Sequence, residues 1–203
     1  MAEFWDERYS SEEYAYGKEP NEFFRAFIDT HPAGSILLPA DGEGRNAVYA
    51  AVKGWSVTAF DQSSEARRKA LLLASEKNVS ITYTVVDASI VTFDRQFDAV
   101  GFFFLHLSAS VRKSMYAHLL SFLRPGGLAV LEGFNQQHLR YREQYGSGGP
   151  GEPDRLFTFD SVKEIFAGYR IDILEEKEVE LREGKFHYGL SSVIRCIASK
   201  GSH

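Results

Sequence analysis

The chain has 203 residues, of which 44% are hydrophobic and 25% are charged, and its formal net charge at pH 7 is −5. This length can bury one sizeable core and is too short for two ordinary domains with a linker. The negative balance excludes an overall basic footprint for nucleic acid and argues against binding to anionic membranes. The densest basic cluster, Arg67, Arg68 and Lys69, is predicted to form a solvated helix face.

A single cysteine, Cys196, excludes an intrachain disulfide and a cysteine-based metal cluster. It lies in an apolar run, so we predict that it is buried and that the protein works in a reducing, cytoplasmic compartment. The N-terminus lacks the pattern of a signal peptide, and no apolar run approaches the ~20 residues of a membrane span. Residues 201–203 resemble the start of an expression-tag remnant, which leaves 1–200 as one predicted domain.

Strand-like apolar runs alternate with helix-period segments along the first two thirds of the chain. Strands are predicted at 35–39, 56–60, 81–86, 97–104 and 128–131, and helices at 45–52, 64–77 and 111–123. Runs that are apolar almost throughout are typical of strands covered on both faces. The alternation predicts a doubly wound α/β sheet of the Rossmann-like kind.

The last third of the chain has a different pattern. A glycine-rich loop at 145–153 precedes a short predicted helix at 160–167. Two further strand-like runs, 171–181 and 186–198, are separated by Arg-Glu-Gly-Lys, which predicts a hairpin. We therefore expect seven strands, mostly parallel, with an antiparallel hairpin at the C-terminus.

The pattern that points to chemistry begins where the first predicted strand ends. Gly42 and Gly44 allow the backbone to approach a ligand closely and to turn sharply into a helix. Asp61 and Asp87 end the next two strands, where carboxylates can accept hydrogen bonds from ribose hydroxyls and an adenine amine. Three neighbouring strand ends thus predict a nucleoside site. The alternative interpretation is a tight turn with two acids that serve only as turn or cap residues.

A dinucleotide site is the closest competing interpretation. It requires a third glycine three residues after Gly44, where this chain has Ala47. Glu43 also places negative charge where phosphates would lie. An adenosyl ligand that carries a cationic sulfonium and no phosphate tolerates this acidic lip better.

With these features the chain resembles the class I S-adenosylmethionine-dependent methyltransferases. Gly-Glu-Gly-Arg-Asn-Ala at 42–47 is similar to their first motif, Phe-Asp-Ala-Val at 97–100 to the start of their fourth strand, and Leu-Arg-Pro-Gly-Gly at 123–127 to their late turn. Within the class, the chain looks most like the tellurite-resistance and thiol-methyltransferase-like group. That likeness is carried by Trp5-Asp6-x-x-Tyr9, Tyr16-Gly17-x-x-Pro20-Asn21 and the segment 184–189.

The resemblance implies S-adenosyl-L-methionine as cofactor and no metal. The cofactor-binding residues it implies are Trp5, Tyr9, Tyr16, Ala40, Gly42, Gly44, Asn46, Asp61, Gln62, Asp87, Ala88 and Phe104. The chain departs from the family at Leu38, where an acid is usual, and at Ala40, where the first glycine is usual. Asp41 takes a position that is usually small and uncharged, and it either compensates for the missing acid or accompanies a lower cofactor affinity.

Three residues are candidates for contact with the methyl acceptor. His106 follows the fourth strand, and a general base, a cofactor contact and a helix cap are all open roles for it. His187 lies in the predicted hairpin near Arg182, where the resemblance places the substrate entrance. His187 and Arg182 are candidates for binding an anionic acceptor. The alternative is that the hairpin is exposed to solvent and does not contact the acceptor.

Aromatic residues crowd the N-terminus, and residues 1–30 are predicted to act as a lid over the sulfonium through cation–π attraction. An anchor on the core is the alternative. The expected reaction is methyl transfer to a small molecule, with a soft sulfur, selenium or tellurium nucleophile as the first hypothesis. Methylation of oxygen or nitrogen on a metabolite, and a non-catalytic module that binds S-adenosylmethionine, are the alternatives.

Overall fold

The computed structural model describes residues 2–202. Its strands are β1 (Ser35–Pro39), β2 (Ser56–Asp61), β3 (Thr82–Val85), β4 (Phe97–Phe103), β5 (Leu123–Phe134), β6 (Arg170–Glu183) and β7 (His187–Ser199). Its α-helices are α1 (Ala2–Tyr9), α2 (Glu22–Thr30), α3 (Arg45–Val52), α4 (Ser64–Glu76), α5 (Ala109–Leu120), α6 (His138–Tyr145) and α7 (Phe159–Ile165), and a short 3-10 helix η1 spans Pro153–Arg155.

The seven strands form one sheet in the order β3-β2-β1-β4-β5-β7-β6. Strands β1 to β5 pair in parallel, whereas β7 pairs antiparallel with both β5 and β6. The predicted fold class, a mostly parallel doubly wound sheet with an antiparallel C-terminal hairpin, is therefore confirmed. The order reverses at β1, where the chain crosses from the β2–β3 half to β4, and open α/β sheets bind ligands outside the strand ends at such a point.

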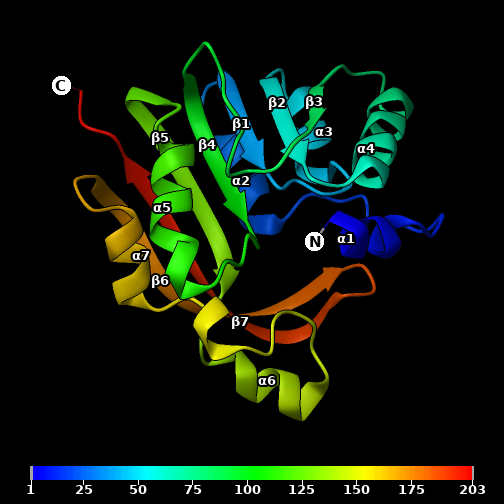
Figure 1. Ribbon diagram of the computed structural model, residues 1–203, viewed down its shortest axis with the longest axis vertical. Coiled ribbons are helices and arrows are strands. Elements are labelled where there is room, and N and C mark those ends of the chain that lie inside the picture. The colour runs from blue at the N-terminus through cyan, green and yellow to red at the C-terminus, as the bar shows by residue number, and fades with distance from the viewer. Residues whose placement is uncertain (1, 203) are drawn as a thin grey trace.

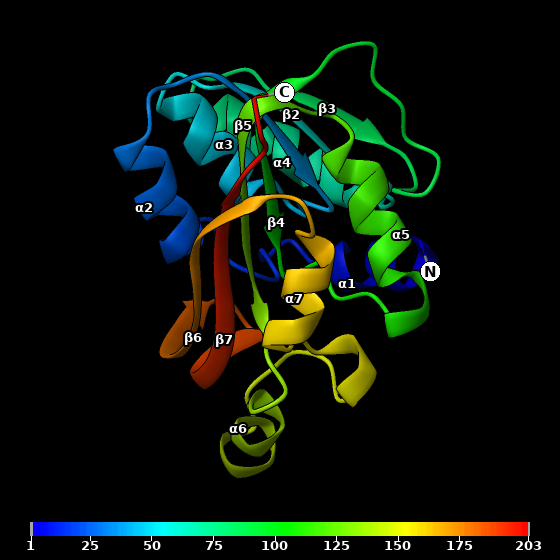
Figure 2. The same cartoon turned by 90° about the vertical axis from the view of Figure 1, so that its left-hand side faces the viewer.

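Helices cover both faces of the sheet, with α2 and α3 on one side and α5 and α7 on the other (Figure 2). The alternation within β1 shows the division: Leu37 packs in the core under α5 and α7, while Ile36 and Leu38 pack in the core under α2 and α3. Each of these side chains is fully or almost fully buried. Cys196 belongs to the first core, as its apolar run predicted.

The structure differs from the sequence-based expectation at the start of β5 and in the role of α2, and several predicted boundaries shift by a few residues; α5, for example, ends at Leu120 instead of 123. Strand β5 begins at Leu123, inside the expected turn, because Leu123 pairs with Phe97 before the register shifts and Ala99 pairs with Leu128. Within the predicted lid, α2 is a core helix, since Phe24 and Phe27 are buried against the sheet. Met1 and His203, which belong to the predicted lid and tag remnant, lie outside the described residues.

Helix α1 and the tip of the β6–β7 hairpin lie at the edge of the sheet to which the arrowheads of β1 and β4 point (Figure 1). Segments from the two ends of the chain therefore meet beside the carboxyl ends of the parallel strands. None of the helices within residues 2–202 combines the length and apolarity needed to cross a membrane.

Candidate functional site

The turn after β1 holds three residues with left-handed backbone: Ala40 at φ 51°, Gly42 at φ 58° and Gly44 at φ 84°. Gly44 is also required for packing, since a Cβ there would lie 2.5 Å from the Cβ of Ala70 on α4. Glycine at this position therefore lets α3 start directly against α4. Ala40 adopts a left-handed conformation at the steric cost that a side chain meets in this region, a cost that glycine avoids.

Asp61 is tied to this turn across the ends of β1 and β2. Its Oδ2 accepts a hydrogen bond from the backbone N–H of Gly42 at 3.2 Å, and its Oδ1 accepts one from that of Ser63 at 3.0 Å. Burial raises the pKa of Asp61 to about 6, against the opposing effect of these hydrogen bonds. No lysine or arginine among the described residues pairs with it, so an ionised Asp61 gains from ligand donors.

Asp87 follows β3 and is exposed. Its Oδ1 accepts hydrogen bonds from the backbone N–H of Ser89 at 2.8 Å and from the Ser89 hydroxyl at 2.6 Å, and these hold its pKa below the usual value. These hydrogen bonds are the local turn or cap contacts that Asp87 would make if it had no role in ligand binding. Because Asp87 also lines the central cavity, a local cap and a ligand contact are compatible there.

A cavity of about 670 Å³ opens at this edge of the sheet, between the strand ends, the N-terminal segment and the β6–β7 hairpin. This volume lies within the range of small-molecule sites, ~300–1,000 Å³. Of the residues predicted to form the site, those that line the cavity are Trp5, Tyr9, Tyr16, Ala40, Gly42, Asn46, Asp61, Gln62, Asp87, Ala88, Phe104, His106 and His187.

Two predicted residues do not line the cavity. Gly44 lies beneath it, where it packs against α4. Arg182 has an exposed side chain, 83% accessible, that pairs with Glu180 at 3.4 Å on the outside of the hairpin. Arg182 therefore does not line the cavity, in contrast to the expectation from the sequence. Side chains alternate along a strand, so it is the next residue, Glu183, that points inward.

His187 lies at the start of β7 and is buried, with its Nδ1 3.4 Å from Oε2 of Glu183. Its ring is enclosed by Phe104 at 4.3 Å and Tyr16 at 4.5 Å between ring centroids. Burial lowers the pKa of His187, partly offset by Glu183, so the neutral ring donates from Nδ1. Its Nε2 has no hydrogen-bond partner in the described part of the chain, and His187 lines the cavity.

His106 also lines the cavity, but both of its ring nitrogens are engaged by backbone. Its Nδ1 lies 3.0 Å from the carbonyl oxygen of Arg155, and its Nε2 accepts from the N–H of Phe134 at 3.2 Å. Burial lowers the pKa of His106 to about 3. The geometry therefore favours a structural role for His106 over the general-base role, because neither nitrogen is free to receive a proton from a ligand.

The N-terminal aromatics line the cavity as a row of contacting rings. Trp5 stacks on Tyr9 at 5.6 Å, and Tyr9 contacts Tyr16 edge-on at 6.3 Å. Tyr9 is 4% exposed, and a Cβ on Gly42 would come within 2.9 Å of its hydroxyl oxygen. Aromatic faces at this position can attract a cation bound above the glycine turn.

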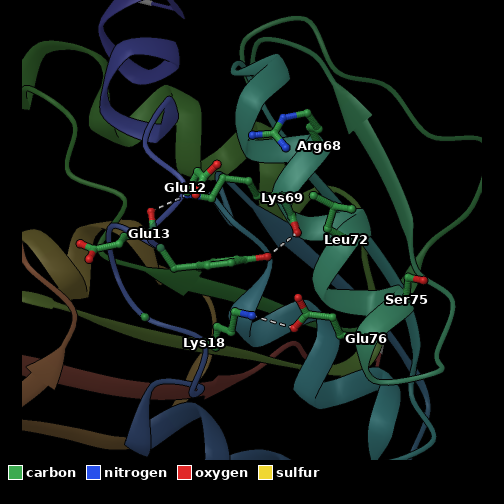
Figure 3. A pocket seen from close by; sticks show the side chains of 10 residues that line it. Glu12, Glu13, Lys18, Arg68, Lys69, Leu72, Ser75 and Glu76 are labelled. Atoms are coloured by element: carbon green, nitrogen blue, oxygen red, sulfur yellow. Dashed lines mark hydrogen bonds and ion pairs between the residues drawn. The ribbon is translucent and has the colours of Figure 1, made fainter.

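The same N-terminal segment is anchored at two points. Asp6 accepts a 2.6 Å hydrogen bond from the hydroxyl of Ser63, the N-cap residue of α4. Lys69 on α4 donates to the carbonyl oxygens of Ser11 and Glu13 at 2.8 and 2.6 Å, and its Nζ lies 4.6 Å from the centroid of the Tyr14 ring. Figure 3 shows Lys69 reaching toward Glu13.

Lys69 corrects two predictions. It is 1% exposed, so it does not belong to a solvated helix face. Its Nζ lies 2.5 Å from Oε1 of Glu43, and both side chains are 2% exposed. Glu43 is therefore not an acidic lip, but half of a buried ion pair that joins the glycine turn to the N-terminal segment. No sequence pattern predicts this contact, because an ion pair between two distant chain segments depends on the fold.

Sequence reasoning also missed a buried polar network behind the cavity. Arg45 donates to Oε2 of Glu183 at 2.8 Å, and Asn21 donates to Oε1 of Glu183 at 2.9 Å and to Glu132 at 2.5 Å. The backbone N–H of Asn21 in turn donates to Oδ1 of Asn46 at 2.9 Å. Asn46 therefore serves the network as well as the cavity wall. The ion pair with Arg45 holds the pKa of Glu183 at about 2, which keeps it ionised beside His187.

The residues present fit an adenosyl ligand with a cationic group. Asp61 offers a carboxylate without a countercharge, the glycine turn leaves room where a side chain would meet Tyr9, and the aromatic row covers the same space. Within residues 2–202, no group of three or more His, Cys, Asp or Glu side chains is placed to hold a metal ion.

Residues 36–127 match the family model described as a methyltransferase domain. The chain is 30% identical over 157 residues to a glycine/sarcosine N-methyltransferase from Aphanothece halophytica, a match that covers 70% of this chain and 58% of that protein. The chain thus spans little more than half of this relative's length.

Two solved structures show the same fold over nearly the whole chain. One, described as converting a disulfide bond into a thioacetal group during echinomycin biosynthesis, has a TM-score of 0.78 at 20% identity and covers 100% of this chain and 93% of its own. TehB from Haemophilus influenzae has a TM-score of 0.72 at 14% identity, with 98% and 66% covered. The tellurite-resistance group is therefore one of several similar groups and is not singled out.

Proposed function

We propose that the chain carries a class I S-adenosylmethionine-dependent methyltransferase domain and that it transfers a methyl group from this cofactor to a small-molecule acceptor bound in the central cavity. We treat residues 1–200 as one domain with this activity. The hydrogen bond between Asp61 and the Gly42 turn carries the proposal, because it sets a carboxylate beside a glycine cradle at the reversal point of the sheet.

Each part of the cavity has a proposed task. Asp61 accepts hydrogen bonds from the ribose, and Asp87 and Ala88 lie where the adenine extends along the end of β3. Trp5, Tyr9 and Tyr16 cover the cationic end and exclude water. S-adenosylmethionine supplies a methyl group on a sulfonium, from which the departing sulfur leaves as a neutral thioether. The protein mainly has to position the acceptor in line with that bond.

His187 is the proposed general base. Glu183 orients the ring through Nδ1, and Nε2 accepts the proton that an amine or thiol loses as its nitrogen or sulfur bonds to the methyl carbon. This arrangement favours an acceptor that is protonated at neutral pH. The similarity to a glycine/sarcosine N-methyltransferase supports a nitrogen acceptor, and the similarity to the echinomycin-pathway structure supports a sulfur acceptor.

A turnover assay with a matched acceptor panel tests this proposal. Primary amines, thiols and selenols are incubated with the protein and S-adenosylmethionine, and S-adenosylhomocysteine formation is followed from pH 5 to 9. We expect methylation of at least one class, with a rate that falls in acid as His187 becomes protonated. Cofactor binding without turnover of any acceptor would instead favour a binding module. A rate independent of His187 would favour a soft nucleophile that needs no base.

A further inference from the structure

Charges in the central cavity are separated between its two ends. The end at β1 to β3 is lined by Asp61 and Asp87, neither of which pairs with a lysine or arginine among residues 2–202, and by Asp41, whose pKa burial raises to about 8 so that it is mostly uncharged at neutral pH. The other end, which we call the acceptor end, is lined by Arg8, Arg142 and Arg155. Glu152 is the one acid lining that end within the described chain, and its carboxylate lies 3.9 Å from Nε of Arg155.

Arg142 on α6 is the cation of the acceptor end on which the proposal rests. Its Nε is buried and has no hydrogen-bond partner in the structure as described, and its guanidinium makes no ion pair there. The backbone of Gly151 packs so closely on Nη1 that a Cβ at this position would displace the guanidinium. Arg142 as a whole is only partly buried, so its cavity-lining guanidinium can reach a ligand, and an acceptor atom there would satisfy donors that no protein group engages.

Hydrogen bonds tie the wall that holds Arg142 to the neighbouring elements. The loop after α6 is tied to β7, since the Tyr188 hydroxyl donates to the carbonyl of Gly146 at 2.9 Å and the Ser147 hydroxyl donates to that of Leu190 at 2.7 Å. His138 on α6 lies 2.7 Å from the carbonyl oxygen of Gly148. Such a preorganised wall costs little to order when a ligand binds.

Arg8 extends the cationic surface to the general base. Its guanidinium carbon lies 3.8 Å from the centroid of Phe186, and its Nη1 donates to the Tyr16 hydroxyl at 3.3 Å. The Tyr16 ring in turn lies 4.5 Å from that of His187. Arg8 has no carboxylate partner among the described residues, so a guanidinium with free donors lies one aromatic ring away from His187.

We propose that the methyl acceptor is a small carboxylate. Its anionic group binds Arg142, with Arg8 as a second cation, while its nucleophilic nitrogen or sulfur faces Nε2 of His187. A guanidinium matches a carboxylate through two parallel hydrogen bonds, which fixes orientation as well as position. This inference rests on the proposed methyl transfer for its reaction, but not for its test, because carboxylate binding is measured without turnover.

The test compares two probes of nearly equal size, 3-mercaptopropionate and 3-mercapto-1-propanol. Each is titrated into the protein saturated with S-adenosylhomocysteine, and the dissociation constant is taken from NMR shifts. We expect the carboxylate to bind at least about tenfold more tightly than the alcohol. Arg142→Gln should abolish this preference and leave the affinity for S-adenosylhomocysteine unchanged. Arg140→Gln is the matched control, because Arg140 is exposed on the same helix and its replacement removes the same charge.

Equal binding of the two probes by the wild-type protein would overturn the carboxylate proposal. A preference that Arg142→Gln and Arg140→Gln reduce equally would also overturn it, because it would then reflect net charge. Neither result bears on the methyltransferase function, which fails only when the cofactor does not bind or no acceptor in the turnover panel is methylated.

Discussion

Nδ1 of His187 lies 3.4 Å from Oε2 of Glu183, and Glu183 is itself held by Arg45 at 2.8 Å. Both residues of the pair are buried at the two ends of the β6–β7 turn. This relationship gives the ring one oriented nitrogen and one free nitrogen that can reach a ligand. It is the arrangement by which a carboxylate fixes the tautomer of a catalytic imidazole.

Replacing His187 by Gln should lower kcat about 10²–10⁴-fold for an acceptor that must lose a proton. Because burial lowers the pKa of His187, the wild-type rate should be flat above the ordinary imidazole pKa and fall only in more acid solution. The variant should lose this acid limb. Rates from pH 5 to 9 measure both effects. Arg182→Gln, in the same hairpin but outside the cavity, should change neither the rate nor the profile.

Asp61→Asn should weaken binding of S-adenosylhomocysteine at least about tenfold, because hydrogen bonds to a charged acceptor contribute about 1.5–3 kcal/mol each. Wild-type affinity should also rise with pH through about 6, as Asp61 ionises. Calorimetry at pH 5 and 8 checks both points. Asp94→Asn, an exposed carboxylate that does not line the cavity, is the control. Unchanged affinity in folded Asp61→Asn would remove this residue from the site.

Asp41→Asn should stabilise the ligand-free protein at alkaline pH. Burial raises the pKa of Asp41 from 3.8 to about 8, so the folded state holds a proton that the unfolded chain has released across that window. Stability is therefore lost as the pH rises toward 8. The variant should be about 1–3 kcal/mol more stable at pH 8 and nearly unchanged at pH 4. Denaturant unfolding curves that run parallel for both proteins across this range would contradict this account.

Gly44→Ala should destabilise the fold by about 2–5 kcal/mol, the sum of left-handed backbone strain and overpacking. Its Cβ would meet Ala70, whereas a Cβ at Gly168 would meet nothing within 4 Å at a similar φ of 86°. Gly168→Ala therefore measures the cost of left-handed backbone alone and should lower the free energy of unfolding by about 1–2 kcal/mol. Equal losses of unfolding free energy in the two variants would mean that α3 and α4 separate easily at this point.

The N-terminal segment should become more protected when the cofactor binds, because covers over ligand sites come from the less stable part of a structure. Amide exchange over residues 5–24 should slow on adding S-adenosylhomocysteine, more than exchange around Gly184. The hydrogen bonds made by Asp6 and Lys69 determine how slowly these amides exchange before ligand is added. Exchange that is already slow and does not change with ligand would identify the segment as a permanent anchor.

The sheet and the cofactor end of the site could be predicted because their signals are local. Apolar runs in the sequence indicate the strands. Residues directly after these runs, such as Gly42 and Asp61, indicate the sheet edge at which the strands end. The acceptor end could not be predicted in this way. Which side chains face the acceptor end depends on which face of β6 points inward, and this face carries Glu183 and not Arg182. It depends also on how α6 and the loop after it fold back against the hairpin. The burial of Lys69 against Glu43 likewise requires two distant segments to meet.

Titration calorimetry with S-adenosylhomocysteine and with NAD tests the central claim most directly, since the two ligands share the adenosine and differ in the group next to it. We predict binding of S-adenosylhomocysteine with a stoichiometry of one to one and no measurable heat with NAD. Binding of NAD in the absence of S-adenosylhomocysteine binding would contradict the assignment of the cavity to a methyl donor.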